Sequence, residues 1–305
     1  MEEVRLLPYT REEVLSMQDA KQKMGWEITS FDLPETWKST QGEGVKVAVL
    51  DTGADLDHED LACNLLPGKN FVNRKASPQD DQGHGSHVSG TICACNNETG
   101  MVGVAPKSKV IPVKVLDKHG AGQLQDVADG IYWAADQGVD FITMSLGAPT
   151  PVDLVHKAIQ YATSKGVVVW CAAGNAGKTH NIFYPAAYKE TIGIGAIDKN
   201  FDRAGFSCTG PDLDFLAPGV GILSTVPKNW YAVLSGTSMA NPFAVGLGCL
   251  LLSYKREKGL KVKLDNSQDY IDFLKMHTIF KGNSLFEGFG IIDPRKMQEW
   301  INLNS

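Results

Sequence analysis

The chain has 305 residues, of which 43% are hydrophobic, and its formal net charge at neutral pH is −6. This length can bury a large core, either in one α/β domain or in two smaller ones. The negative balance gives no electrostatic reason to expect nucleic acid or an anionic membrane as a partner, and no apolar run approaches the roughly 20 residues that a membrane-spanning helix needs.

The first 20 residues differ from the rest of the chain. They are polar and charged, with acids at Glu2 and Glu3, and they contain one short apolar group. A secretory signal contains a longer apolar stretch, so we expect none here. We predict that residues 1–20 form a separate segment in front of one large domain, residues 21–305.

From about Lys21 onward, apolar runs alternate with amphipathic stretches. The runs are short and rich in β-branched residues, which is typical of strands buried on both faces. They cover residues 45–50, 110–116, 141–146, 167–172 and 192–197. Residues 123–137 and 151–165 have helical spacing of apolar side chains. This alternation predicts an α/β fold of three layers, with a mainly parallel central sheet and helices on both faces.

Asp51, Ser145 and Asn175 lie at or just after the ends of three apolar runs. In a parallel sheet, ligands gather at the carboxyl ends of the strands. We therefore expect these three residues to share one rim of the sheet.

Three glycine-rich strings carry an aspartate, a histidine and a serine: VAVLDTGAD around Asp51, GHGSHVSGT around His84 and SGTSMANP around Ser238. A serine hydroxyl is a weak nucleophile that needs an adjacent base. Ser238 also precedes an apolar helical stretch, where free backbone N–H groups favour developing negative charge. Taken singly, Ser238 is equally typical of a helix cap and Asp51 of a turn.

The three strings, in the chain order Asp, His, Ser, resemble the motifs of the subtilisin-like serine proteases. The resemblance extends from about Gln22 to Gly290 and is closest to the intracellular subtilisins. It implies a serine endopeptidase with protein and peptide substrates, which cleaves through an acyl-enzyme on Ser238.

The resemblance also implies a role for each polar residue. His84 would be the general base, and Asp51 would orient it. The string AAGN matches the family's oxyanion-hole asparagine, Asn175. The second histidine of the HGSH string, His87, is expected to be structural, because zinc-binding pairs on helices usually lie at i and i+4 with a glutamate.

A substrate cleft is implied in the same way. An extended peptide would bind as an added strand between two segments, in front of two apolar pockets. The flanking segments are Gly120–Gly122 and Ser145–Gly147. The walls of the first pocket are Ser145, Leu146 and Gly147 on one side and Ala172 to Gly174 on the other, and an outer pocket is formed by Leu116, Leu124 and Val127. Phe183 stands where many relatives have a small residue. We hypothesise that it shortens the first pocket; the alternative is that it points elsewhere.

Calcium is the one cofactor that the resemblance implies. The loop after the His84 helix is similar to the family's strong calcium loop, and hard oxygen ligands suit calcium. The implied ligands are backbone oxygens of Cys95, Thr99 and Met101 and side chains of Gln22, Asp60 and Asn97. A second, weaker cation site would use backbone oxygens of Ala186, Tyr188 and Thr191.

The apolar group in the N-terminal segment is Leu6-Leu7-Pro8-Tyr9. It resembles the short L-I-P-Y extension of the intracellular subtilisins, with Leu7 in place of isoleucine. The resemblance implies that the segment crosses the active site and blocks it until it is removed. Pro8 lacks an N–H and would disturb the strand pairing of a cleavable peptide. The alternative is a disordered tail.

Six cysteines lie at positions 63, 93, 95, 171, 208 and 249. We expect all six to be free thiols in a reducing cytoplasm. Intracellular members of the family are often dimers, so a homodimer is a further expectation from the resemblance.

Two other functions are compatible with the sequence. One is a processing protease dedicated to one or a few proteins, for which Phe183 and the Asn241-Pro242-Phe243 string leave room. The other is a catalytically silent binding protein on the same fold, which the intact set of Asp51, His84, Ser238 and Asn175 disfavours.

Overall fold

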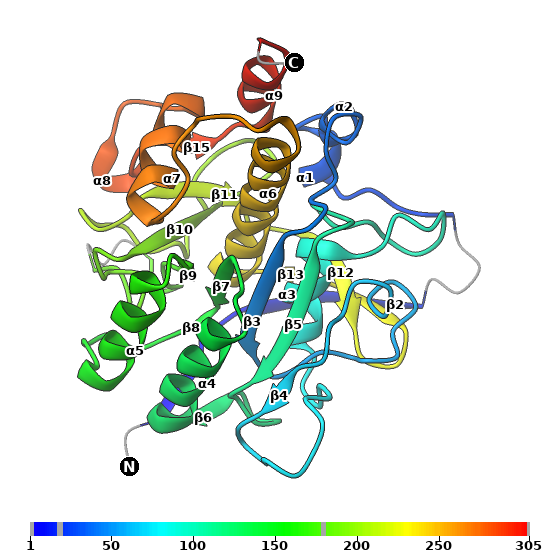
Figure 1. Cartoon of the computed structure of the whole chain (residues 1–305), viewed down its shortest axis with the longest axis vertical. Helices are drawn as coiled ribbons and strands as arrows, with labels where there is room; N and C mark the ends of the chain where they lie inside the picture. Colours follow the sequence, from blue (N-terminus) through cyan, green and yellow to red (C-terminus); the bar gives the residue numbers. More distant parts are fainter. Residues whose placement is uncertain (1–2, 17–20, 178–180, 304–305) are drawn as a thin grey trace.

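The computed structural model describes residues 3–16, 21–177 and 181–303. A central sheet of nine strands runs through the molecule, with helices on both sides (Figure 1). Its strands are parallel except for β14, which pairs antiparallel with β15 at one edge. The order across the sheet is β14 (Thr278–Ile279), β15 (Ile291–Ile292), β11 (Phe215–Pro218), β10 (Thr191–Ile197), β9 (Val168–Ala172), β7 (Phe141–Met144), β3 (Lys46–Asp51), β5 (Lys109–Lys114) and β4 (Lys69–Asn70).

The five apolar runs of the sequence form five adjacent strands of this sheet, β10, β9, β7, β3 and β5. The strands are almost wholly buried, as expected for a parallel sheet covered on both faces. The predicted three-layer α/β fold is therefore confirmed.

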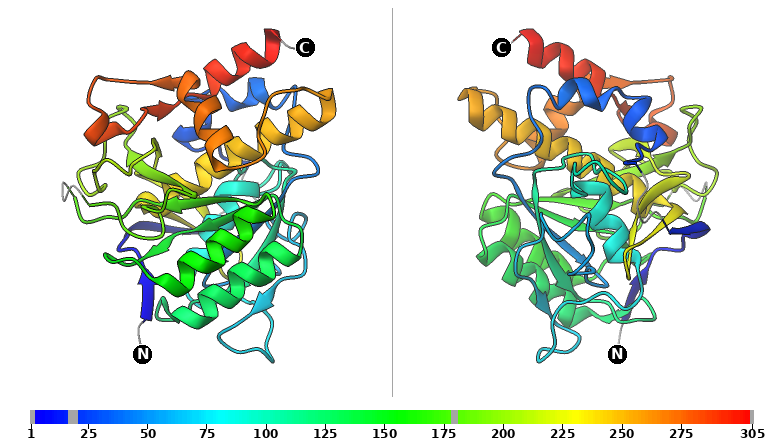
Figure 2. Two further views of the ribbon diagram at one scale, coloured as in Figure 1. Left: turned by 60° about the vertical axis from the view of Figure 1, so that its left-hand side comes forward. Right: turned by 90° about the vertical axis from the view of Figure 1, so that its right-hand side faces the viewer.

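Two pairs of helices form the outer layers. Helices α4 (Leu124–Asp136) and α5 (Asp153–Ser164) pack together on one face, and α3 (His84–Cys93) and α6 (Thr237–Lys258) pack together on the other (Figure 2). Shorter helices lie around these layers: α1 (Trp26–Thr29), α2 (Leu33–Thr36), α7 (Ser267–Leu274), the 3-10 helix η1 (Lys275–His277), α8 (Ser284–Glu287) and α9 (Pro294–Leu303). None of the helices in the described part of the chain is both long and apolar enough to cross a membrane.

The N-terminal segment contributes one strand to each of two small sheets. Strand β1 (Glu3–Leu6) lies between β6 (Ala121–Gln123) and β8 (Leu146–Gly147) and is antiparallel to both. Strand β2 (Thr10–Ser16) pairs antiparallel with β13 (Trp230–Ser235), which also pairs with β12 (Ile222–Val226). The predicted end of the segment at residue 20 lies outside the described residues.

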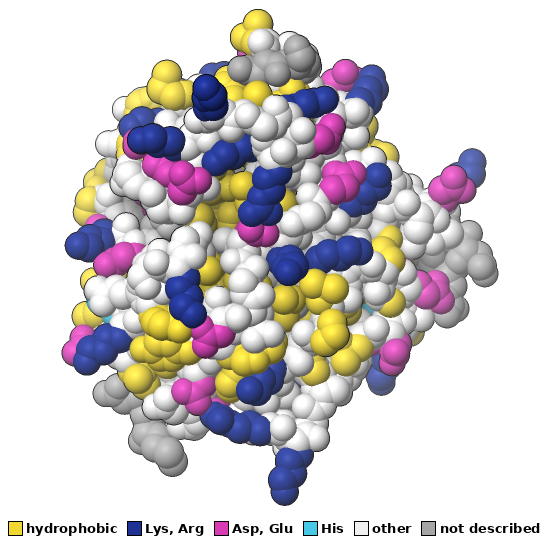
Figure 3. Space-filling view, in the orientation of Figure 1, with side chains coloured by type: hydrophobic (Ala, Val, Ile, Leu, Met, Phe, Trp, Pro, Cys, Tyr) yellow, Lys and Arg dark blue, Asp and Glu magenta, His cyan; other side chains and the backbone are white. Residues whose placement is uncertain are grey.

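On the face shown in Figure 3, basic and acidic side chains are interspersed with apolar ones. The charged side chains of this face form no continuous area of one sign.

Candidate active site

The polar residues predicted to share one rim lie at the carboxyl ends of the central strands. Asp51 is the last residue of β3, Ser145 follows β7, and Asn175 comes soon after β9. Because β3, β7 and β9 are parallel neighbours, their ends lie side by side. Ser238 reaches the same rim from the N-terminus of α6, where it is the second residue.

His84 is the first residue of α3 and is fully buried together with Asp51. Its Nδ1 atom lies 2.9 Å from both carboxylate oxygens of Asp51. The start of α3 can lie this close to the turn after β3 because residue 85 is glycine: a Cβ at Gly85 would lie only 2.1 Å from the carbonyl oxygen of Gly53. A histidine fixed in this way keeps its other nitrogen, Nε2, available for proton transfer.

Asp80 ties the histidine loop to the aspartate turn, and the sequence analysis missed it. Its buried carboxylate accepts hydrogen bonds from the Thr52 hydroxyl, from the backbone N–H groups of Gln82 and Gly83, and from the backbone and hydroxyl of Ser86. An acidic residue just before a helix start is a recognisable signal. That signal could have identified Asp80 as the residue that positions the start of α3.

Ser238 and Ser145 hold each other in place. The Ser238 Oγ atom donates to the carbonyl oxygen of Ser145 at 3.4 Å, and Ser145 Oγ donates to the carbonyl oxygen of Ser238 at 3.3 Å. The Ser238 carbonyl is free to accept this bond because the residue four positions later, Pro242, has no N–H. The proline inside α6 therefore has a specific consequence at the serine.

Asn175 is anchored by its oxygen and directs its nitrogen outward. Its Oδ1 atom accepts hydrogen bonds from the N–H and the hydroxyl of Thr237, both at 2.9 Å. Its Nδ2 atom donates to the backbone carbonyl of Pro8 at 2.6 Å. A backbone carbonyl thus occupies the position in which an oxyanion donor would meet its substrate.

The N-terminal segment also covers the histidine. The ring of Tyr9 lies 5.0 Å from that of His84, and the Tyr9 hydroxyl accepts a hydrogen bond from Gln82. Among the described residues, His84 Nε2 has no hydrogen-bond partner. A hydrogen bond between Ser238 and His84 is therefore not formed in this state.

The second histidine, His87, does not contact Asp51 or Ser238. Its Nε2 atom lies 3.1 Å from the carbonyl oxygens of Ile222 and Ala232. Burial, reinforced by the nearby His84, lowers the pKa of His87 to about 3. A neutral ring that donates to these carbonyls holds α3 against β12 and β13.

The segments predicted to flank a peptide are brought together by β1. Val4 pairs with Gly122, Arg5 with Gly147 and Leu6 with Leu146, and the Leu6 N–H donates to the carbonyl oxygen of Gly120 at 2.9 Å. The predicted outer-pocket residues Leu116 and Leu124 are buried in the same core cluster as Val4.

Leu7 and Phe183 meet at the predicted first pocket. Leu7 is 1% exposed, and its Cδ2 atom would lie 3.1 Å from a Cβ built on Gly147. The ring of Phe183 would lie 3.1 Å from a Cβ on Gly174. Phe183 therefore lies between the two predicted walls of the pocket, one that ends at Gly147 and one that runs from Ala172 to Gly174.

The loop after α3 forms a cluster of oxygen atoms. The Nε2 atom of Gln22 lies 2.8–3.3 Å from the carbonyl oxygens of Cys95, Thr99 and Met101 and from Oδ1 of Asn97. An amide nitrogen has two protons, so it can satisfy only two of these four oxygens. The cluster thus fits a hard cation better than it fits an amide.

Asp60 fixes two residues of this cluster, Asn97 and Met101, through hydrogen bonds. Its carboxylate accepts hydrogen bonds from Asn97 Nδ2, the Met101 N–H and the Tyr231 hydroxyl. Within the described ranges, no group of three or more His, Cys, Asp or Glu side chains could hold a metal. The oxygen cluster instead consists mainly of the backbone carbonyls of Cys95, Thr99 and Met101.

The second expected cation site has a different arrangement. The Thr191 hydroxyl lies 2.9–3.2 Å from the carbonyl oxygens of Pro185, Ala186 and Tyr188, and therefore already offers them a donor. Burial raises the pKa of the neighbouring Asp214 to about 7, which weakens its negative charge at neutral pH. This cation site stays a prediction.

The expectation of six free thiols is wrong for two cysteines. Cys63 and Cys95 form a disulfide, with Cα atoms 6.6 Å apart, whereas Cys93, Cys171, Cys208 and Cys249 are buried and take part in no disulfide among the described residues. The two partners are 32 residues apart in the sequence. Only the fold brings them together, so their spacing gave no sign of the bond.

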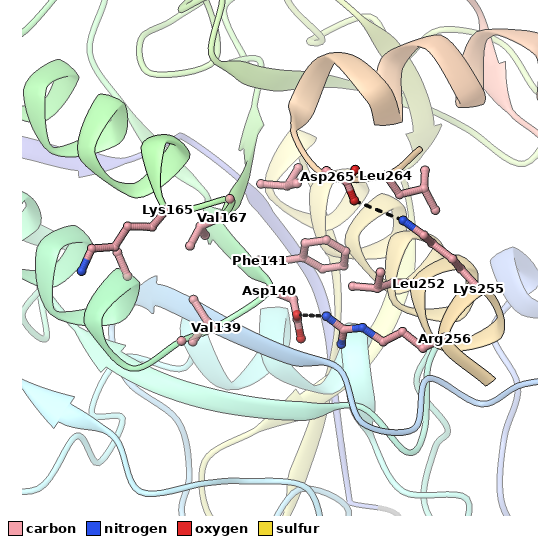
Figure 4. Close-up of a pocket in the computed structure, with 14 residues that line it drawn as sticks. Val139, Asp140, Phe141, Lys165, Val167, Leu252, Lys255, Arg256, Leu264 and Asp265 are labelled. Carbon is pink, nitrogen blue, oxygen red and sulfur yellow. Dashed lines mark hydrogen bonds and ion pairs between the residues drawn. The ribbon is translucent and has the colours of Figure 1, made fainter. Parts of the chain in front are cut away.

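A separate hollow of about 410 Å³ lies at the amino ends of the central strands, near the starts of β7 and β9 (Figure 4). Two ion pairs cross it, Arg256–Asp140 and Lys255–Asp265. From Ser238 to Lys255 the distance along α6 is about 25 Å. This hollow contains none of the predicted site residues.

Comparison with known proteins agrees with this geometry. The subtilase family profile matches residues 42–290. The chain belongs to the subtilase family. It is 41% identical to an intracellular serine protease of Paenibacillus polymyxa, over 97% of this chain and 92% of that protein. It is 39% identical to the major intracellular serine protease of Bacillus subtilis (strain 168), over 90% and 88%.

A subtilisin of Bacillus pumilus is 42% identical over 83% of this chain and 90% of that protein. These matches confirm the predicted family and show that the chain is a subtilisin-like serine endopeptidase, close to the intracellular subtilisins.

The position of Phe183 yields a prediction for this endopeptidase. We expect peptides with leucine before the cleaved bond to be cleaved with a higher kcat/KM than matched peptides with phenylalanine. Phe183→Ala should shift the ratio toward phenylalanine by about tenfold or more, since burying one more large apolar group is worth about 1.5–3 kcal/mol. A strong preference of the unaltered chain for phenylalanine would contradict this role.

Proposed function

We propose that Asp51, His84 and Ser238 are the catalytic triad of this endopeptidase and that Asn175 completes the oxyanion hole. The observation that supports this most is the placement of a backbone carbonyl, that of Pro8, on Asn175 Nδ2. The carbonyl lies on the rim that also holds the buried Asp51–His84 pair.

The reaction proceeds in two stages. Ser238 Oγ turns from the Ser145 carbonyl toward His84 Nε2, gives up its proton there and attacks the carbonyl carbon of the substrate. Asn175 Nδ2 and the Ser238 backbone N–H stabilise the tetrahedral oxyanion. The histidine then donates its proton to the leaving amine, and water hydrolyses the acyl-enzyme by the same route. Asp51 stabilises the imidazolium that forms in both stages.

We also propose that residues 1–16 inhibit the enzyme by binding along the substrate cleft in a register that does not allow cleavage. A cleavable residue places its side chain in the first pocket and its own carbonyl on Asn175. Here Leu7 is buried beside Gly147, whereas the carbonyl on Asn175 belongs to Pro8. Pocket and oxyanion donor are thus occupied by consecutive residues, and Tyr9 covers His84.

Loosening the segment should activate the full chain. Leu7→Ala removes apolar contacts worth about 2 kcal/mol or more, so we expect kcat/KM on a peptide substrate to rise about 30-fold. Arg5→Ala is the matched control, because the Arg5 side chain is 68% exposed. This substitution should leave kcat/KM nearly unchanged. Equal activity of both variants and of a chain freed of residues 1–16 would contradict inhibition by the segment.

We propose calcium as the structural cation of the oxygen cluster after α3. Cys95, Thr99 and Met101 would supply carbonyl oxygens, and Gln22, Asn97 and Asp60 would supply side-chain oxygens. The ion would neutralise these converging oxygens and fix the loop that follows the histidine helix. The four oxygens around a single amide nitrogen support this assignment.

Calcium should therefore stabilise the protein. At a calcium concentration about 100 times the dissociation constant, the gain is about 2.7 kcal/mol, which corresponds to a rise in Tm of about 4 °C for a chain of this length. Asn97→Ala should lose most of this rise. Asn96→Ala should keep it, because Asn96 contributes no atom to the cluster. A Tm that is unchanged by chelation, measured by scanning calorimetry, would rule out the site.

A cytoplasmic location is the last part of this proposal. Its support is that two relatives are named as intracellular serine proteases. The Cys63–Cys95 disulfide argues in the other direction, because such bonds are rare in reducing compartments. Measuring the oxidation state of these two cysteines in freshly lysed cells tests the location.

A further inference from the structure

Strand β13 has one edge that only the N-terminal segment covers. In the three-stranded sheet, β13 lies in the middle, with β12 on one side and β2 on the other. The segment pairs with it from Thr10, opposite Ser235, to Ser16, opposite Trp230. Removal of residues 1–16 would convert β13 into an edge strand with unpaired N–H and C=O groups, which is a template for another strand.

The covered edge continues the substrate path. The chain that forms β1 passes Asn175 at Pro8, passes His84 at Tyr9 and then forms β2. One continuous peptide is therefore paired on both sides of Ser238. Counted from the carbonyl on Asn175, Thr10 is the second residue after the reacting position and Ser16 is the eighth.

Strand β2 is held mainly by its backbone. Six of its seven residues are exposed, and only Leu15 is half-buried. The Ser235 hydroxyl donates to the Glu12 carboxylate, but Glu12 is the extra residue at the bulge opposite Val233 and Leu234. Pairing that depends so little on side chains can be taken over by a strand of another sequence.

We propose that, once the segment is removed, the β13 edge binds the part of a substrate that follows the cleaved bond, as an added antiparallel strand reaching the eighth residue. This inference rests on the proposed function. The substrate class is an extended, unfolded polypeptide with about seven or more residues beyond the cleaved bond. A short peptide or a tightly folded loop cannot supply such a strand.

The test uses the full chain, folded first and then freed of residues 1–16 by limited proteolysis, with circular dichroism to verify that the fold is kept. Fluorogenic peptides share one sequence before the cleaved bond and carry three or eight residues after it. We expect kcat/KM to be at least about tenfold higher for the longer peptide, since each added backbone hydrogen bond contributes modestly. Equal values would overturn the inference.

Two variants of the longer peptide test the mode of binding. N-methylation at the fifth, sixth and seventh residues, one at a time, should lower kcat/KM only at alternate positions, because successive N–H groups of a strand face opposite edges. Scrambling the fourth to eighth residues should leave kcat/KM nearly unchanged. A flat methylation scan, or loss of the gain on scrambling, would overturn recognition by backbone pairing.

Binding without cleavage separates this inference from the proposed function. Ser238→Ala, processed by an added protease in the same way, should bind the longer peptide about tenfold more tightly than the shorter one by fluorescence anisotropy. If the unaltered processed chain cleaves neither peptide, the proposed function fails. In that case equal affinities in the Ser238→Ala chain would overturn the β13 inference and a tenfold difference would support it.

Discussion

The hydrogen bond between His84 Nδ1 and the Asp51 carboxylate is the contact on which the arrangement of the active site depends. It joins the end of β3 to the start of α3, and both residues are buried completely. A buried carboxylate is tolerated only when donors surround it, and here the Thr52 N–H donates to Asp51 as well. Asp80 then fixes the two connecting loops to each other through Thr52 and Ser86.

A second constraint acts from α6. The helix begins at the rim, so Thr237 can hold Asn175 while Ser238 faces Ser145. Two polar networks therefore meet at the carboxyl ends of the strands: one joins the turn after β3 to the start of α3, and the other lies at the start of α6. The parallel order of β3, β7 and β9 brings them together, which explains why residues 51, 84, 145, 175 and 238 lie on one rim of the sheet.

Much of this could be predicted from the sequence. The strands that build the centre of the sheet are continuous β-branched runs, and the strings around Asp51, His84 and Ser238 identify the chemistry. Asp80 was missed although an acidic residue just before a helix start is a recognisable signal, and its bond to the distant Thr52 appears only in the folded chain. The Cys63–Cys95 bond was missed because it joins two distant loops. The register of Leu7 and Pro8 depends on three-dimensional contacts that no motif encodes.

The central claim is that the chain's own N-terminal segment covers the rim where Asp51, His84, Asn175 and Ser238 come together. Its most direct test is the rate at which an organophosphonate labels Ser238, followed by intact mass and peptide mapping, before and after limited proteolysis removes residues 1–16. The account predicts slow labelling of the intact chain, at least about tenfold faster labelling after processing, and the label on Ser238 in both. Equal rates, or a label on another residue, would contradict it.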